Sequence, residues 1–386
     1  MGQAPIRQGV VNIKQVAKKA GVSVATVSRV INRSGTVDAD TAATVWKVVK
    51  ELDYKPNLAA RHMKGHLTGC IGLLVPDIES PFFASIAAGA LAEAQKHDQV
   101  MIISNAEGNR SMEVTAIDAL SRSVIDGLIY IPVSTGDPLP EVERFRHLPV
   151  VVVGRRGIFK DRPHVYVDNV KGGYIATKYL LALGRRRIAF IAGFWDPPCS
   201  RETILDTLER EDVGAFTTLD RFQGYIKALK EGGLPFDPEL IAIVGYDYKA
   251  GYNGAAELIG RLVNIDGILA ANDLVAAGAV SFLRDQGIKV PTDISVIGYD
   301  DGTGATLSYP RLTSVRQDAR KLGKSAVEVM NRLLMKEKSG EVNGEFEIKD
   351  VVVDVSLTIR GSTAARPGAF GLRPNGTDQK LSKEFY

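Results

Sequence analysis

Apolar residues near the start of the chain recur at the three- and four-residue spacing of amphipathic helices. Such stretches cover residues 12–20, 24–32 and 38–52. Gly21 is expected to end the first helix in a left-handed turn, and Ser23 is expected to cap the start of the second. Two short helices joined by a tight turn, with a third helix that completes a small core, predict a helix-turn-helix unit.

Beyond residue 67 the pattern changes to short apolar runs that alternate with helical stretches. The strand-like runs are residues 70–75, 100–104, 127–131, 150–153, 188–192, 241–244, 267–270 and 295–299, and the helical stretches are residues 82–96, 112–121, 169–183, 220–231, 252–261, 273–286 and 318–336. Near-continuous apolar strands between helices are typical of parallel sheets covered on both faces. Because there are too many units for one modest sheet, we expect two doubly wound α/β lobes, with a ligand cleft beyond the carboxyl ends of their strands.

Charge also divides the chain into two parts. Residues 1–66 contain eleven Lys and Arg against four Asp and Glu, a net charge of +7. The remaining 320 residues have a net charge of −4. A small basic unit joined to a mildly acidic body indicates a polyanionic partner for the first unit alone.

Composition narrows the class of protein. Apolar residues make up 45% of the chain and charged residues 24%, as in a soluble globular protein. No run approaches the roughly 18 apolar residues of a membrane span, and the first ten residues lack the apolar core of a secretory signal. Cys70 and Cys199 lie far apart, which favours a reduced, cytoplasmic protein over a disulfide scaffold.

The sequence carries no pattern of an enzyme. We find no Walker loop, no glycine-rich dinucleotide motif and no Ser-His-Asp arrangement. The five histidines show no metal-ligand spacing; His62 and His66 are four residues apart, but they are better suited to phosphates or solvent. We therefore expect no catalysis, no cofactor and no metal.

The second helix, residues 24–32, is the candidate recognition helix. In a helix-turn-helix its first residues face base edges in the major groove. Arg29 could donate to guanine O6 and N7, Val24 and Ala25 could contact only thymine methyl groups, and Thr26 and Ser28 suit phosphates. The alternative is that Arg29 is a solvated surface residue.

The stretch from Val11 to Asn32, VNIKQVAKKAGVSVATVSRVIN, resembles the DNA-binding headpiece of the LacI/GalR family of repressors almost residue for residue. The resemblance implies that Val24, Ala25 and Arg29 face the bases, and the Val-Ala pair is similar to the galactose-type branch. It continues through residues 52–61, LDYKPNLAAR. The DNA-contacting residues that it implies are Ser23, Val24, Ala25, Thr26, Ser28, Arg29, Asn32, Asn57, Ala60 and Met63.

Residues 57–66 follow Pro56, which should end the preceding helix. A helix of about two turns is marginal alone in water, so it would fold only against a partner. The resemblance implies a hinge helix that forms on operator DNA, pairs with the same helix of a second protomer and drives an apolar side chain into the minor groove. Met63 stands where the family has leucine; methionine is also a known wedge. The alternative is a plain linker.

Seven short motifs in the body resemble the effector domain of the same family, which is similar to ribose-type periplasmic binding proteins. They lie at residues 71–83, 150–155, 183–193, 220–225, 270–279, 297–301 and 312–317. The resemblance implies a carbohydrate in the cleft. Phe82 and Phe83 would stack on it, Arg155 and Arg221 would donate hydrogen bonds, and Asp273 would accept from two hydroxyls.

Gln317 would line the cleft at a crossing between lobes, and Ser80 stands where related sugar-binding proteins often have asparagine. Gly154 replaces the aspartate that often precedes the arginine. The stretch 195–219 is longer than the usual loop, so it forms either a lid, with Trp195 closing the cleft, or an inert surface insertion.

The resemblance implies four regions along the chain: a headpiece over 1–56, a hinge helix over 57–66, an effector-binding and dimerisation domain over 67–360, and a disordered tail over 361–386. The first lobe would comprise residues 67–167 and 318–349, and the second lobe residues 168–317 and 350–360. Crossings between the lobes are expected near Asp168, Gln317 and Asp350.

We therefore expect a cytoplasmic homodimeric repressor that binds near-palindromic double-stranded operator DNA and is controlled by a small carbohydrate. Two alternatives remain at this point. One is a soluble sugar sensor without DNA activity, and the other is an activator or global regulator that responds to a non-sugar metabolite.

Overall fold

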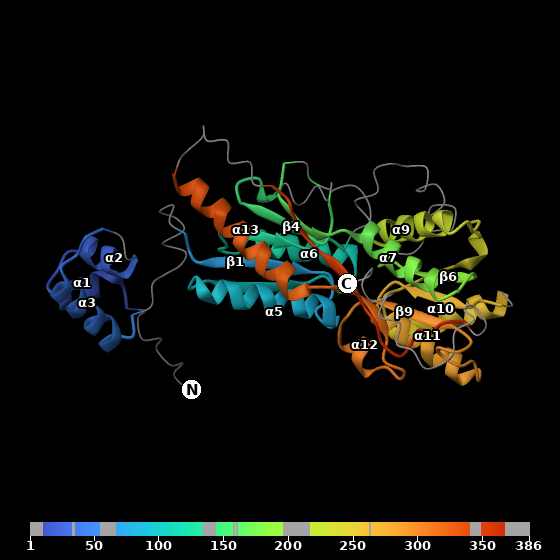
Figure 1. The fold of residues 1–386 in the computed structure, drawn as a ribbon. Helices are drawn as coiled ribbons and strands as arrows, with labels where there is room; N and C mark the ends of the chain where they lie inside the picture. Colours follow the sequence, from blue (N-terminus) through green and yellow to red (C-terminus); the bar gives the residue numbers. More distant parts are fainter. Residues whose placement is uncertain are drawn as a thin grey trace, which may run out of the picture. The chain divides into compact units, whose positions relative to one another are not determined.

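In the computed structural model, the described residues are 11–32, 35–54, 67–133, 144–156, 159, 161–195, 217–261, 264–339 and 349–366, without the side chains of residues 32 and 337–339. The chain forms two compact units, residues 1–68 and residues 69–386, which are described separately (Figure 1). None of the described helices is long and apolar enough to cross a membrane.

The first unit consists of α1 (Ile13–Ala20), α2 (Val24–Asn32) and α3 (Ala39–Glu51). Asn12 and Gln15 cap the start of α1 reciprocally, because the side chain of each accepts the backbone N–H of the other. Gly21 ends this helix at a φ of 69°, the left-handed conformation that favours glycine. The expected helix-turn-helix is confirmed.

A small core joins these three helices. Its fully buried members come from all three, at the spacing that the apolar pattern predicted: Val16, Ala17, Val27, Val30, Val45 and Val48. Lys19 of α1 also lies 3.0 Å from Glu51 of α3. The whole core of this unit therefore lies within about forty consecutive residues, which leaves the outer faces of the helices available for a partner.

The second unit has two lobes, each built around a six-stranded sheet. In sheet order, the N-lobe strands are β11 (Val351–Val353), β5 (His164–Val167), β4 (Val150–Val153), β3 (Gly127–Tyr130), β1 (Cys70–Val75) and β2 (Val100–Asn105). The C-lobe strands are β12 (Val355–Thr358), β10 (Thr313–Gln317), β9 (Ser295–Asp300), β8 (Gly267–Ala270), β6 (Ile188–Gly193) and β7 (Ile241–Val244). Neighbouring strands are parallel except for β10 and β12.

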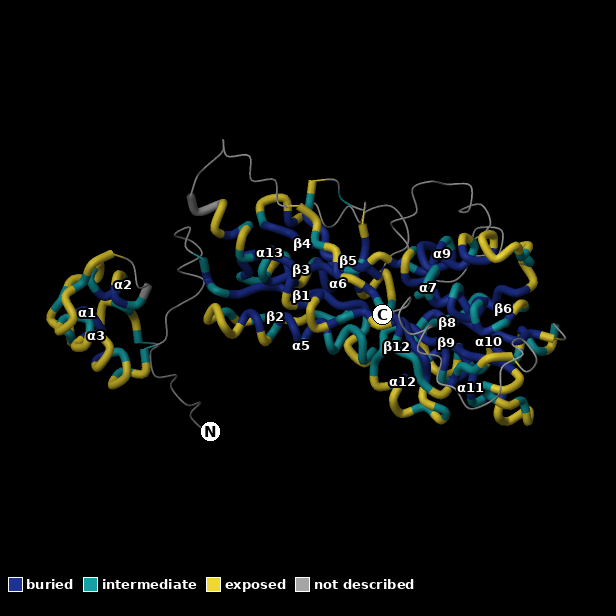
Figure 2. Tube along the Cα trace, in the orientation of Figure 1, coloured by how far each residue is buried: buried dark blue, intermediate teal, exposed yellow. Residues whose placement is uncertain are grey.

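Helices cover both sheets. The N-lobe carries α5 (Pro81–Lys96), α6 (Arg110–Ser121) and α13 (Ala319–Ser339), with α5 packed against α13. The C-lobe carries α7 (Asn169–Ala182), α9 (Thr217–Glu231), the 3-10 turn η3 (Pro238–Leu240), α10 (Tyr248–Arg261), α11 (Asp273–Asp285) and α12 (Thr303–Leu307). Here α7 packs against α9 and α10 against α11. The strands between the helices are largely buried (Figure 2), so the two expected doubly wound lobes are confirmed.

The chain passes between the sheets after β5, after β10 and between β11 and β12. We expected the third crossing near Asp350, with residues 350–360 in the second lobe. Instead Val351–Val353 pair in parallel with β5 of the N-lobe, and the crossing is at Asp354. The strands β5, β10 and β12 did not stand out in the sequence because polar residues interrupt their apolar runs, and β11 is only three residues long.

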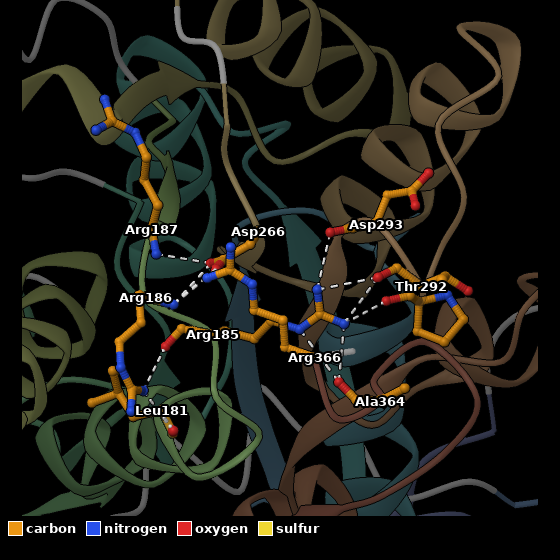
Figure 3. A network of polar contacts seen from close by, with 10 residues as sticks. Leu181, Arg185, Arg186, Arg187, Asp266, Thr292, Asp293, Ala364 and Arg366 are labelled. Carbon is orange, nitrogen blue, oxygen red and sulfur yellow. Dashed lines mark hydrogen bonds and ion pairs between the residues drawn. The ribbon is translucent and has the colours of Figure 1, made fainter. Parts of the chain in front are cut away.

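The beginning of the expected tail, Gly361–Arg366, is part of the C-lobe. Ser362 is fully buried; its hydroxyl donates to the Val296 carbonyl at 2.6 Å and accepts the Thr313 N–H at 2.8 Å. The guanidinium of Arg185, also fully buried, donates to the carbonyl of Ala364 at 3.0 Å (Figure 3). Residues 367–386 lie outside the described residues.

The same network fixes the start of β6. The carboxylate of Asp266 accepts the backbone N–H groups of Arg186 and Arg187 and forms an ion pair with Arg366 at 3.2 Å (Figure 3). Arg185 also donates to the carbonyls of Pro291, Thr292 and Asp293. Buried polar groups are costly unless they are hydrogen-bonded, so this network explains how an arginine is accommodated inside the lobe.

Candidate functional site

The exposed side of α2 carries the residues expected to read bases. Val24 is 37% exposed, and Ala25 and Arg29 are exposed as well. Val27 and Val30, on the opposite side, are buried in the core of the unit. The helix can therefore offer methyl groups and one guanidinium to a groove without losing its packing.

Ser23 and Thr26 hold the start of α2. The N–H of Thr26 donates to the Ser23 hydroxyl oxygen at 3.0 Å, and the two hydroxyl groups are 2.9 Å apart. This arrangement caps the helix as its sequence predicts. Ser28 is half-buried beside them. The side chain of Asn32 and all of Asn57, Ala60 and Met63 lie outside the described residues.

In the second unit, a cavity of about 540 Å³ lies between the two lobes. It is lined by turns that follow strands of both sheets, the place where ligands bind in doubly wound folds. Six of the seven expected ligand-binding residues line it: Ser80, Phe82, Phe83, Arg155, Arg221 and Gln317. The side chains expected to bind the effector are thus brought together from segments up to 237 residues apart.

Asp273 is the exception. It is not among the residues that line the cavity, and it is buried at the start of α11. One carboxylate oxygen accepts from the Ser314 hydroxyl at 2.6 Å and the other from the Gly302 N–H at 2.7 Å. The two hydrogen bonds thus connect the start of α11 to β10 and to the turn after β9. Its neighbours Asn272 and Leu274 do line the cavity, and each carboxylate oxygen has a second lone pair, so the role of Asp273 toward ligand hydroxyls stays a prediction.

A second carboxylate, that of Asp300, lies at the cavity. This residue lines the cavity at the end of β9, and one of its carboxylate oxygens accepts from the Gln317 amide at 2.6 Å. Its backbone has a φ of 102°, a conformation that a non-glycine residue rarely adopts. Burial raises the pKa of Asp300 to about 7, although Arg221 and the Gln317 hydrogen bond act to lower it. The motif Gly298-Tyr299-Asp300-Asp301 was the only sequence signal for this residue.

The two cationic side chains of the site are held rigidly. Arg221 donates to the Asn169 side chain at 2.9 Å and lies 3.7 Å from the centre of the Tyr299 ring. Arg155 donates to the Val133 carbonyl at 3.0 Å. Burial lowers the pKa of the Arg155 guanidinium from its usual value. Both can therefore present fixed donors to a ligand.

Aromatic rings form one wall of the cavity. Phe82 and Phe83 lie edge to face, with ring centroids 5.3 Å apart. Trp195, from the turn after β6, lies 6.2 Å from Phe83 and 4.8 Å from Tyr246 between ring centroids. Tyr246 was not expected from the sequence, since it has no motif of its own. We call Phe82, Phe83, Trp195 and Tyr246 the aromatic wall.

Acidic side chains surround the same cavity. Glu79, Glu107 and Asp247 are exposed lining residues, and Asp77 is half-buried. We call these four residues the acidic rim. In the described part of the chain, no group of His, Cys, Asp or Glu has the arrangement of a metal site.

The sequence matches two family models. Residues 12–57 match the model of bacterial regulatory proteins of the lacI family, and residues 68–350 match that of periplasmic binding proteins and the sugar binding domain of the LacI family. The curated protein HTH-type transcriptional regulator RegA of Clostridium saccharobutylicum is 35% identical over 336 residues, which cover 87% of this chain and 96% of that protein.

Solved structures with the same fold include two regulators. The transcriptional regulator CelR in complex with cellobiose has a TM-score of 0.63 and 31% identity, covering 91% of this chain and 99% of CelR. The lac repressor dimer bound to operator and the anti-inducer ONPF has a TM-score of 0.72 and 24% identity, covering 92% of this chain and 99% of that one. The latter likeness concerns the fold alone.

Proposed function

Because the chain belongs to the lacI family of bacterial regulatory proteins, we propose that it is a repressor whose affinity for operator DNA is set by a carbohydrate bound between the two lobes. Membership makes the chain a DNA-binding transcriptional regulator with an effector-binding domain, and its relatives are regulators rather than enzymes. As a regulator of bacterial genes it would work in the cytoplasm. The direction of control, the sugar and the residue roles are the proposed parts.

The exposed face of α2 supports the DNA-reading role. It carries Val24, Ala25 and Arg29 on a unit with a net charge of +7. We propose that Arg29 forms a bidentate hydrogen bond with a guanine, and that Ser23, Thr26 and Ser28 contact phosphates. Asn32, Asn57, Ala60 and Met63 are proposed as further DNA contacts, the last three within a hinge helix over residues 57–66.

The test of this role compares Arg29→Ala with Arg29→Lys. A base-reading arginine is worth about 1–3 kcal/mol of discrimination against the wrong base, and lysine lacks the planar fork that makes the contact. Both variants should lose most of the preference for the correct operator over one altered at a single base pair, measured by fluorescence anisotropy. If Arg29→Lys keeps the full preference, Arg29 contacts a phosphate and the proposed base contact is wrong.

One observation carries the carbohydrate part of the proposal: fixed polar donors and acceptors line the same interlobe cavity as the aromatic wall. The polar side chains would form hydrogen bonds with the sugar hydroxyl groups. Arg155 and Arg221 would donate, Asp300 would accept, and Gln317 and Ser80 could do either. Phe82 and Phe83 would cover an apolar sugar face. The 31% identical regulator CelR was solved with cellobiose, which favours this class of ligand.

A thermal-shift screen over sugars, nucleosides and amino acids tests the class of ligand, because a ligand that binds the folded state raises the unfolding temperature. The sugar that binds is then added to the protein–operator complex. Release of DNA identifies an inducer, and tighter binding identifies a co-repressor. A non-sugar metabolite as the only ligand would contradict the carbohydrate part, and would favour a regulator that responds to another class of compound.

We also propose that the effector unit pairs with a second copy of the chain. The edge strand β2 exposes apolar residues along its length (Figure 2): Val100 is 61% exposed, Ile102 37% and Ile103 38%. An exposed apolar edge strand is an unprotected pairing surface. Leu307, the last residue of α12, and Tyr309, just beyond it, are also exposed apolar residues, at 84% and 87%.

A dimer would place two headpieces on two half-sites of a near-palindromic operator. Ile103→Lys should convert the dimer to a monomer in sedimentation velocity and weaken operator binding. Val352→Lys is the matched control, since this exposed residue lies on β11 at the opposite edge of the sheet. An unchanged dimer in Ile103→Lys would show that the chain pairs through another surface.

A further inference from the structure

The side chains that line the interlobe cavity fall into three layers according to how far they are exposed. At the bottom, Arg155, Arg221 and Gln317 are only 8%, 7% and 5% exposed. The half-buried aromatic rings come next, and the exposed carboxylates of Glu79, Glu107 and Asp247 come last. Asp300, which is half-buried and accepts from Gln317, adds a carboxylate to the inner polar groups. The lining thus runs from buried polar groups through half-buried rings to exposed carboxylates.

From this layering we propose that the cavity contains two sugar subsites and selects an uncharged disaccharide or longer saccharide over a monosaccharide or an anionic sugar. The polar bottom would bind the first ring, and the surface of Trp195 and Tyr246 would bind the second. This inference rests on the proposed carbohydrate function and adds the size and charge of the effector.

The size of the cavity supports more than one ring. Its volume of about 540 Å³ lies in the middle of the range of roughly 300–1,000 Å³ that is typical of sites for drug-sized ligands. Phe82 and Phe83 belong to the N-lobe, at the start of α5, whereas Trp195 and Tyr246 come from the C-lobe, after β6 and β7. Each lobe thus supplies aromatic surface, so a ligand can be covered by rings from both sides of the cavity.

Trp195 is fixed against the opposite lobe. A Cβ on Gly108, in the N-lobe turn after β2, would lie 2.3 Å from Cε3 of the Trp195 ring. Gly108 also has a φ of 63°, so two features favour glycine at this position. Tyr246 is fixed in turn, because its hydroxyl lies 2.8 Å from that of Thr218. These contacts hold the two rings as a preformed surface.

The acidic rim supports the selection against anions. Asp77, Glu79, Glu107 and Asp247 all line the cavity, and the two lining arginines lie in the buried layer. A phosphate or carboxylate on the outer ring would meet like charge, which repels it. A neutral outer ring would meet hydrogen-bond acceptors for its hydroxyl groups.

The experiment measures affinities by isothermal titration for matched pairs of monosaccharide and disaccharide: glucose with cellobiose and with maltose, galactose with lactose, and xylose with xylobiose. The disaccharide of the series that binds should exceed its monosaccharide by about tenfold or more, the gain expected from one additional stacked ring. Trp195→Ala should lower the disaccharide affinity to that of the monosaccharide and leave the monosaccharide affinity unchanged. Trp195→Phe should keep part of the gain.

Tyr248→Ala is the matched control, since Tyr248 is an exposed aromatic near the site that does not line the cavity. It should change neither affinity, and thermal unfolding of each variant confirms that it folds. Charge is tested with the aldonate of the same disaccharide. The double variant Glu79→Gln/Glu107→Gln should raise the ratio of aldonate to disaccharide affinity by about tenfold.

The outcomes separate the two proposals. If no sugar binds, the proposed carbohydrate function fails and this inference fails with it. If a monosaccharide binds as tightly as its disaccharide, or if Trp195→Ala weakens both equally, the carbohydrate function stands and the outer subsite is wrong. An affinity ratio that does not change in the double variant would contradict the role of the acidic rim.

Discussion

Asp300 combines two features that lower the stability of the folded protein. Its backbone φ of 102° is strained for a residue with a Cβ atom, and its carboxyl is desolvated beside a second buried carboxyl, that of Asp273. Burial and the charge of Asp300 both raise the pKa of Asp273 well above its usual value. Such strain persists where function requires it, and here it directs an acceptor into the cavity.

The pH dependence of stability follows from Asp300. Its pKa in the folded protein, about 7, is raised above the value of about 3.9 for an unfolded chain. Between these values the folded state binds more protons, so the free energy of unfolding falls as the pH rises through this window. Asp300→Asn removes this loss, and should raise the free energy of unfolding by up to about 4 kcal/mol at pH 8 with no gain at pH 4.

Denaturant titrations at the two pH values measure the effect of this substitution. Asp301→Asn is the matched control at the next residue, where the carboxylate lies 2.6 Å from the Arg360 guanidinium. It removes an ion pair and should lower stability at pH 8. Equal losses in both variants would mean that burial of the Asp300 carboxyl is not destabilising.

The sequence predicted the kind of residues in the site better than their individual roles. The helix over residues 24–32 and six cavity residues could be predicted, because short motifs mark the strand ends and helix starts that carry Phe82, Arg155 and Arg221. Asp273 and Asp300 could not be distinguished, because both follow a strand and only the folded turn decides which carboxylate faces the cavity. The contact between Trp195 and Tyr246 joins turns fifty residues apart, which no local pattern contains.

At the scale of elements, the segment Gly361–Arg366 is an integral part of the effector unit. Its glycine and polar residues resemble a tail in sequence, yet Ser362 is fully buried and Ala364 accepts from Arg185. Hydrogen bonds, rather than apolar area, attach it to the lobe, so hydrophobic pattern alone could not predict its packing.

Two truncations test this attachment. A chain that ends at residue 360 leaves the Thr313 N–H and the Val296 carbonyl without Ser362, and the Arg185 guanidinium without Ala364. Each unsatisfied buried group costs about 1–3 kcal/mol, so this chain should lose roughly 3–9 kcal/mol of stability. A chain that ends at residue 366 keeps every one of these bonds and should unfold like the full chain in thermal denaturation. Equal unfolding temperatures would contradict a structural role for the segment.

For the whole molecule, the binding of DNA and the binding of a neutral sugar should differ in their dependence on salt concentration. DNA binding by a unit with eleven Lys and Arg releases counterions, whereas binding of a neutral sugar releases none. If six to ten phosphates are contacted, operator affinity should fall by about 10³–10⁵ between 50 and 200 mM salt. Sugar affinity, measured by titration in the same buffers, should stay nearly constant. An equally steep fall for the sugar would indicate a charged effector.

The crossing between β11 and β12 determines when each part of the molecule can be completed during synthesis. Both six-stranded sheets need a strand from residues 351–358, so neither lobe can close its sheet until nearly the whole chain has left the ribosome. The small core of the first three helices needs only residues 11–54. A nascent chain therefore completes its DNA-binding helices long before its effector unit. Premature termination would release DNA-binding units that no metabolite controls.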